Sequence, residues 1–269
     1  LLPVLWVAHI PQFIFISAAC SNDSMVIASS TATVYWLARL LTKAAHKSIT
    51  LLEWIFLGVL IGLAALSKLQ GLGLLPLVVV ATLLIAAIQR DWRLPFRAVL
   101  PVTMAALLVA GWWYWRNYSL YGDWFGVTNL LANNGLRPEP ITWASFWGEF
   151  RGLRYSFWGI FGWFNILLPT WVYALLDGIT VVALAGLPVA WLAKRPTPDN
   201  PGAQGASLVR LLLLSWVLIS VALLIYWLSQ ATSSQGRLFF PALSAFAVLL
   251  VLGLHAWLRY LPTRVQPIL

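Results

Sequence analysis

The sequence predicts an all-α fold, a polytopic transmembrane bundle of about eight helices with one long external loop. Hydrophobic residues make up 61% of the 269 residues, charged residues only 9%, and the mean hydropathy is +0.84. Soluble domains carry roughly 25% charged residues, so this composition indicates a protein embedded in a bilayer. The 17 tryptophans and 13 phenylalanines are typical of aromatic belts at the two membrane interfaces.

A membrane-spanning helix needs about 20 mostly apolar residues. One domain is expected over residues 1–269, with residues 116–165 as the external loop and 194–207, rich in proline and glycine, as a cytoplasmic linker. The candidate spans are 2–20, 25–42, 53–67, 72–88, 97–115, 166–193, 208–228 and 238–258.

The basic residues set the expected orientation. If residue 1 lies in the cytoplasm, eleven of the 17 lysines and arginines fall inside and six fall outside, which agrees with the positive-inside rule. The same preference explains the formal net charge of +9 without a nucleic-acid partner, because no basic patch with stacking aromatics lies on a soluble region. The unusual polar segments then meet at the outer face, which is where we expect the chemistry.

Metal chemistry based on cysteine or histidine is not expected. The single cysteine, Cys20, excludes an internal disulfide and a cysteine-rich site, and the three histidines lack ligand spacing. Asn22-Asp23 follows the first apolar run, and Asp23 is a candidate ligand for Mg²⁺ or Mn²⁺ bridging to a phosphate. Asn22, Asp23 or Ser24 can equally cap a helix that starts near Met25. The spacing favours the cap, and the two roles are compatible.

Three cations on the outer face are candidate ligands of a lipid phosphate, namely Lys68, Arg116 and Arg237, with Gln235 beside the last. An ammonium pairs with a phosphate, and a guanidinium can bind one through two hydrogen bonds. Each side chain can instead anchor a helix at the interface. We hypothesise that the three cations share one phosphate site.

Two acids attract attention for different reasons. Asp123 lies in a turn, Tyr121-Gly122-Asp123, and is a weak catalytic candidate. Asp177 lies within the run 166–193, and an acid in a spanning segment indicates function. The run is longer than a bilayer requires, however, so Asp177 can lie at its outer edge.

The long loop also carries many aromatic side chains, Trp158 and Trp163 among them. They can stack on sugar rings or rest on lipid, and aromatics at a membrane surface are more often interfacial. Glu149 and Arg151 are expected to form a solvated pair that contributes little to stability.

Taken in order, the short motifs resemble bacterial members of the GT-C glycosyltransferase superfamily, in the protein O-mannosyltransferase-like and aminoarabinose-transferase-like branch. The resemblance covers most of the chain, and its specificity lies in the ordered set. The motifs are Pro11-Gln-Phe, Ser21-Asn-Asp23, Ala64-Ala-Leu-Ser-Lys68, Arg116-Asn, Tyr121-Gly-Asp123, Trp158-Gly-Ile-Phe-Gly-Trp163 and Gln235-Gly-Arg237.

The resemblance implies an enzyme of the bacterial inner (cytoplasmic) membrane that takes a sugar from a polyprenyl-phosphate carrier. Transfer to an acceptor occurs on the periplasmic or extracellular face, with inversion. The family's usual base lies in an external loop after its first helix, and this chain shows no such loop. The chain is therefore expected to be N-terminally truncated and to lack the first two helices and the principal base.

By the same resemblance, Asn22-Asp23 is similar to the family's second acidic site. The alternative function is a non-catalytic transporter or binding subunit for a lipid-linked saccharide. The expected partners are the polyprenyl-phosphate-linked sugar and membrane lipids, and the one expected cofactor is the divalent cation at Asp23. The expected site comprises base candidates Asp23 and Asp123, phosphate ligands Lys68, Arg116, Arg237 and Gln235, and sugar or acceptor ligands Asn22, Asn117, Trp158 and Trp163.

Overall fold

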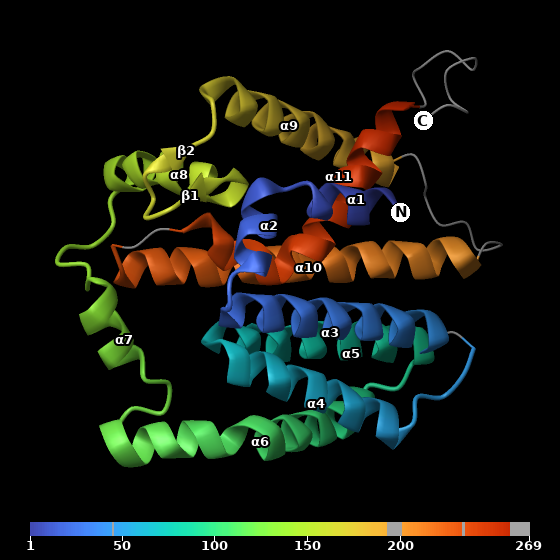
Figure 1. Cartoon of the computed structure of the whole chain (residues 1–269). Coiled ribbons are helices and arrows are strands. Elements are labelled where there is room, and N and C mark those ends of the chain that lie inside the picture. The colour runs from blue at the N-terminus through green and yellow to red at the C-terminus, as the bar shows by residue number, and fades with distance from the viewer. Residues whose placement is uncertain (45, 193–200, 233–234, 259–269) are drawn as a thin grey trace.

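The computed structural model describes residues 1–44, 46–192, 201–232 and 235–258, and this part of the chain is an α-helical bundle (Figure 1). Two strands, β1 (Ile160–Phe161) and β2 (Ile166–Leu167), form a small antiparallel hairpin. The helices are α1 (Leu2–Ala8), α2 (Pro11–Ala18), α3 (Asn22–Ala44), α4 (Leu51–Ser67), η1 (Leu69–Gly73), α5 (Leu74–Gln89), α6 (Leu94–Tyr121), α7 (Val127–Asn134), α8 (Trp143–Trp158), α9 (Thr170–Leu192), α10 (Pro201–Gln230), η2 (Gly236–Ala242) and α11 (Leu243–Trp257).

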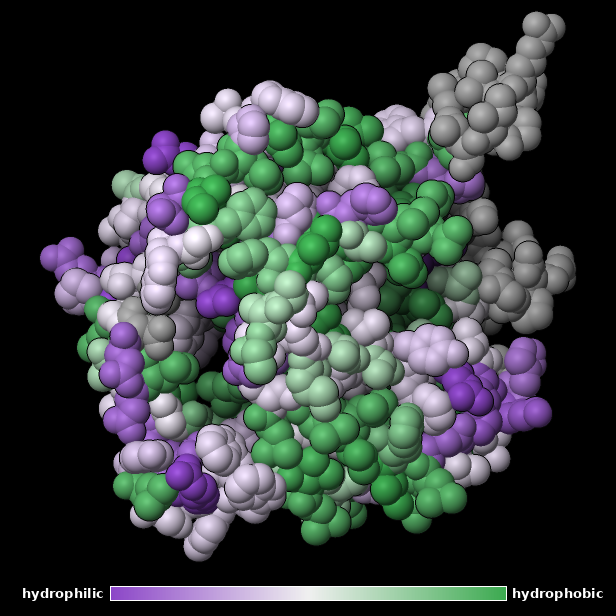
Figure 2. Space-filling view, viewed as in Figure 1, coloured by the Kyte–Doolittle hydropathy of each residue, from purple (hydrophilic) through white to green (hydrophobic). Residues whose placement is uncertain are grey.

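The all-α membrane-type bundle that the sequence predicts is confirmed. Within the described residues, five helices are long and apolar enough to cross a membrane, or six if the bent pair α2 and α3 is one span. Helix α4 is apolar but shorter. In Figure 2 hydrophobic side chains form a broad band over the bundle, and hydrophilic side chains gather mainly toward its two ends.

The first predicted span, residues 2–20, is wrong. Two short helices occupy it, and α2 meets α3 at an angle of 115°. Pro11 is the first residue of α2. Proline lacks the amide hydrogen that a continuing helix would need, but it suits a first helical position. The segment is apolar as predicted, but the helix breaks before Pro11, which composition alone does not reveal.

Most of the predicted external loop is folded. Helix α6 continues to Tyr121, and α7, α8 and the hairpin follow. Thr142 and Ser145 form a reciprocal cap at the start of α8, which satisfies free N–H groups there. The elements α7, α8 and β1–β2 all lie on the left side of Figure 1, with α7 low in the view and α8 and the hairpin high, and we call this end of the bundle the α7 end.

The predicted linker 194–207 divides into two parts. Residues 194–200 lie outside the described residues. Pro201 opens α10, where proline is favoured because its missing N–H group would have no helical partner. The second half of the predicted linker is therefore helix rather than loop.

Large apolar side chains from several helices fill the bundle core. Leu37 of α3, Leu57 of α4, Leu77 of α5 and Trp216 of α10 are fully buried. Helices α9 and α11 approach one another closely where Gly186 faces Gly253. A Cβ atom at Gly186 would meet the carbonyl group of Gly253. Small residues at such crossings are typical of membrane helix pairs.

This contact gives a stability prediction. Gly186→Ala places a methyl group against backbone that cannot turn aside, so we expect the stability to fall by about 1–3 kcal/mol, as in other overpacked cores. Gly178→Ala is the matched control, because Gly178 lies on the same helix and a Cβ atom there would meet nothing within 4 Å. Thermal unfolding of the two variants in detergent compares them. Equal midpoints would contradict close packing of α9 on α11.

Candidate functional site

A cavity of about 1180 Å³ lies at the α7 end of the bundle. Its walls come from the end of α4, from η1, α6, α7 and α10, and from the start of η2. Segments that are distant in sequence therefore meet around one space. Its polar lining residues include Asn22, Lys68, Gln70, Asn117, Asn129, Asn133, Gln230, Gln235 and Arg237.

One carboxylate holds both cations of this cavity. Asp23 Oδ1 lies 2.6 Å from Lys68 Nζ, and Asp23 Oδ2 lies 3.5 Å from Arg237 Nη1. The Asp23 side chain is only 5% exposed, whereas Lys68 and Arg237 are 21% and 34% exposed. A buried carboxylate is tolerated when it is paired. We call these three residues the ion cluster, and it carries one net positive charge beside the cavity.

The backbone around Arg237 explains how it reaches Asp23. The Gly236 N–H group donates to Ser156 Oγ at 2.7 Å, which docks η2 on α8. A Cβ atom at Gly236 would meet the backbone of Leu153 and Phe157, so only glycine permits this approach. Gln235 Oε1 accepts a hydrogen bond from Arg237 Nε. The Gln-Gly-Arg sequence thus turns the guanidinium toward the ion cluster.

The surroundings of Asp23 do not fit a divalent metal ion. Helix α3 begins at Asn22, so Asp23 lies in its first turn, where a negative charge is favourable. Both carboxylate oxygens face cationic side chains, which would repel Mg²⁺ or Mn²⁺. Among the described residues, no group of three or more His, Cys, Asp or Glu side chains is placed to hold a metal ion.

Arg116 does not join the other two cations, so the predicted three-cation site is wrong in this respect. Arg116 is exposed on α6, and its guanidinium carbon lies 5.1 Å from the centre of the Trp113 ring. The next residue, Asn117, is buried and lines the cavity. Successive helical residues differ by about 100° around the axis, which turns Arg116 away when Asn117 faces inward.

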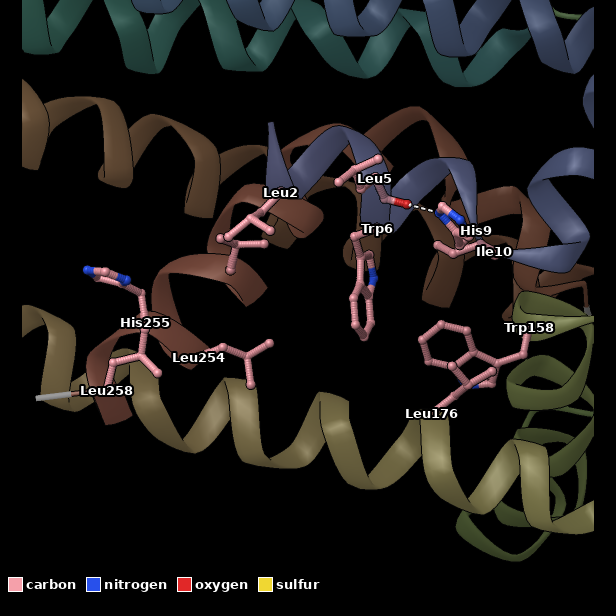
Figure 3. Close-up of a pocket in the computed structure, with 11 residues that line it drawn as sticks. Leu2, Leu5, Trp6, His9, Ile10, Trp158, Leu176, Leu254, His255 and Leu258 are labelled. Carbon is pink, nitrogen blue, oxygen red and sulfur yellow. Dashed lines mark hydrogen bonds between the residues drawn. The ribbon is translucent and has the colours of Figure 1, made fainter. Parts of the chain in front are cut away.

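The two tryptophans predicted to bind sugar also lie elsewhere. Trp158 is buried and lines a separate cavity of about 460 Å³, into which its ring and that of Trp6 point (Figure 3). Trp163 is 96% exposed in the hairpin turn. The amides of the same predicted group, Asn22 and Asn117, do line the larger cavity.

Asp177 links two helices at the α7 end. Trp158 Nε1 donates to its Oδ1 at 2.8 Å, and Arg154 Nε lies 3.2 Å from Oδ2. These contacts join α8 to the second turn of α9. Asp177 therefore lies near the start of a spanning helix rather than at its centre, which agrees with the alternative that it lies at the edge of the apolar run.

Asp123 organises the start of α7. Its carboxylate accepts the N–H groups of Thr128 at 2.9 Å and Phe125 at 3.0 Å, so the predicted turn is present. The hydrogen bond from the Thr128 backbone, followed by that from Phe125, lowers the pKa of Asp123 below its usual value. Asp123 does not itself line the cavity, but Phe125 and Gly126 do.

A contact that no sequence pattern predicts holds the chain just after α7. Arg137 Nη2 donates to both carboxylate oxygens of Glu149, at 2.7 and 2.9 Å, and Arg137 Nε donates to the Leu228 carbonyl at 2.8 Å. The Arg137 side chain is only 8% exposed. The expected pairing of Glu149 with Arg151 overlooked this partner, because no local spacing relates residues 137, 149 and 228.

Two further lining residues were missed although a signal was present. Asn129 and Asn133 of α7 both line the cavity. Their separation of four places them on one helical face. The interpretation of residues 116–165 as a loop concealed this spacing.

The ion cluster yields a stability prediction. Asp23→Asn leaves Lys68 and Arg237 close together without an anion, and removing one partner of a buried pair costs about 3–5 kcal/mol. We expect a lower unfolding midpoint in detergent, partly restored by adding Lys68→Met. Asp91→Asn is the control, because its pair with Arg97 spans 3.6 Å and is exposed, and such pairs contribute about 0–1 kcal/mol. Similar losses in both single variants would argue against a buried cluster.

Comparison with known proteins gives a family but no characterised relative. No curated protein matches the chain, and no solved structure matches it. A family described as "Predicted membrane protein (DUF2142)" matches residues 1–245. Because the match covers most of the sequence, the chain belongs to the DUF2142 family of predicted membrane proteins.

Proposed function

We propose that the protein is an integral membrane glycosyltransferase that takes a sugar from a polyprenyl-phosphate carrier. The observation that carries the proposal is the cavity at the α7 end, beside which Lys68 and Arg237 retain one net positive charge. A sugar joined to a polyprenyl phosphate is a phosphodiester with one negative charge, so the charges match. The resemblance of the ordered motifs to GT-C glycosyltransferases supports the same function.

The carrier's two chemical parts suit two different surroundings. The cavity provides polar groups at the end of the bundle, whereas the bundle surface provides exposed apolar side chains such as Leu107 and Leu108 on α6 and Leu218 and Ile225 on α10. A prenyl chain remains in the bilayer beside such side chains while its phosphate reaches the cations. Lys68 and Arg237 bind this phosphate, with Gln235 holding the guanidinium in place.

The transfer step follows from this placement. An acceptor oxygen attacks the anomeric carbon, the bond from that carbon to the phosphate oxygen breaks, and the configuration inverts. The departing polyprenyl phosphate gains a second negative charge, which Lys68 and Arg237 stabilise. The acceptor proton passes to Asp123, which lies just outside the cavity lining, next to Phe125 and Gly126. Its two carboxylate oxygens each accept a backbone hydrogen bond and retain further acceptor sites.

A specific observation favours a second candidate, a subunit that binds or moves a lipid-linked saccharide without chemistry. Both oxygens of Asp23 face cations, and hydrogen bonds lower the pKa of Asp123. A carboxylate with a lowered pKa is a weak general base at neutral pH. Binding of the carrier requires the cations but no base.

A transfer assay distinguishes the glycosyltransferase from the binding subunit. It uses the full-length protein in membranes and radiolabelled polyprenyl-phosphate sugars. We expect Arg237→Gln to lower the rate by about 100-fold, because a cation that stabilises the leaving phosphate is lost. Arg116→Gln, a change of the same kind on an exposed cation outside the cavity, should leave the rate unchanged.

Asp123→Asn distinguishes the base from the binding groups, and carrier binding is measured beside turnover in each variant. Lost turnover with retained binding supports the transferase. Carrier binding that depends on Arg237, with no turnover in the unchanged full-length protein, supports the binding subunit instead. If Arg237→Gln changes neither carrier binding nor turnover, both the transferase and the binding-subunit proposals lose their basis.

The proposal also places the cavity on the outer face of the bacterial inner membrane, and Cys20 tests this directly. Cys20 is exposed and lies two residues before Asn22, which lines the cavity. We expect a membrane-impermeant maleimide to label the protein in intact spheroplasts, and Cys20→Ser to remove that labelling. Labelling of Cys20 only after the membrane is opened would reverse the orientation.

A further inference from the structure

In the part of the chain that the structure describes, the lining of the cavity is rich in amides and free of acids. Seven asparagine and glutamine side chains in this part line it, and no aspartate or glutamate there does. They come from α3, η1, α6, α7, α10 and the residue before η2, so they surround the space rather than form one stripe. Each carboxamide offers two donors and an acceptor without a net charge. Such a set suits a ligand with many neutral hydroxyl groups.

One of these amides, that of Gln70, has a buried oxygen without a hydrogen-bond partner among the described residues. The oxygen is Oε1, and Gln70 lines the cavity. A buried acceptor without a partner is costly. If the amide is turned over, the same position offers a donor instead. A sugar hydroxyl both donates and accepts, so it satisfies either orientation.

The charge around the cavity excludes one class of sugar. Lys68 and Arg237 outnumber Asp23 by one charge, and among the described residues no aspartate or glutamate lines the cavity to bind an ammonium group. Asp123, the proposed base, lies outside this lining. A protonated amino sugar would therefore bring a third cation next to two others. Like charges brought together at a binding site are strongly unfavourable.

We propose that the cavity selects a neutral, polyhydroxylated sugar on its phosphate carrier and rejects a cationic amino sugar. This inference rests on the proposed function and specifies its donor. Gln70 from η1, with Asn129 and Asn133 from one face of α7, binds the sugar hydroxyls. Lys68 and Arg237 bind the phosphate.

The first test compares three donors that share one polyprenyl phosphate, carrying glucose, glucosamine or N-acetylglucosamine. Full-length protein in membranes is assayed at pH 6, where the free amine is protonated. Because a like-charge contact amounts to a tenfold effect or more, we expect kcat/KM for glucosamine to be at least about tenfold below that for glucose. Acetylation removes the charge and should recover most of this loss.

The second test separates sugar binding from phosphate binding. Gln70→Leu, and Asn129→Ala with Asn133→Ala in one variant, should weaken binding of the glucosylated carrier by about 2- to 10-fold, the effect of neutral hydrogen bonds. Binding of polyprenyl phosphate without a sugar should not change. Ser119→Ala is the control, because Ser119 is an exposed polar residue of α6 that does not line the cavity.

The outcomes distinguish this inference from the proposed function. Transfer of glucosamine as fast as glucose, or amide variants that bind both carriers normally, would overturn the neutral-sugar site while the transferase stands. If none of the three donors is transferred and the sugar-free carrier does not bind, the proposed function fails and the inference fails with it.

Discussion

The carboxylate of Asp23 lies between Lys68 and Arg237, and through these contacts α3, the end of α4 and the start of η2 meet. In a bundle of apolar helices a buried charge is stable only with a partner of opposite sign. One carboxylate cannot neutralise two cations, so a positive charge remains beside the cavity. The contact that joins these three segments thus also leaves a positive charge beside the cavity, which is the basis of the proposed phosphate site.

The opposite wall of the cavity depends on a different kind of contact. Helix α7 is fixed at its start by the Asp123 carboxylate and beyond its end by Arg137, which binds Glu149 and the end of α10. Both sets of contacts are polar and lie outside the long apolar helices. The bundle therefore supplies the cations and most of the lining amides, whereas the folded segment between α6 and α9 adds Asn129 and Asn133.

These two walls together make the case for a lipid-linked sugar phosphate. A phosphate requires cations, and sugar hydroxyls require neutral donors and acceptors, while a prenyl chain requires an apolar surface. All three environments are present in this protein: the ion cluster and the amides line or adjoin one cavity, and exposed apolar side chains lie on α6 and α10, two of the helices that wall it. A soluble anion would make no use of the apolar surface.

The sequence by itself determined the class of fold and which end of the helices carries the polar groups. A bilayer requires every backbone group to be satisfied internally, so long apolar runs with few charges are helices. Five polar residues that the sequence places on one face line one cavity in the structure, namely Asn22, Lys68, Asn117, Gln235 and Arg237. The sequence did not determine the break at Pro11 or the folding of residues 121–165. Proline and aromatic segments do not by themselves reveal which neighbours they pack against.

Only the tertiary structure decided which expected side chains share the cavity. Arg116 and Asn117 are adjacent in sequence, but a helix turns them to different sides, and the packing of α6 selects the asparagine. Trp158 donates a hydrogen bond to Asp177, away from the cavity, and Trp163 lies exposed at the tip of the hairpin. Asp23 finds its partners far along the chain, at residues 68 and 237. Composition and local spacing do not encode such distant contacts, because helix packing alone brings those residues together.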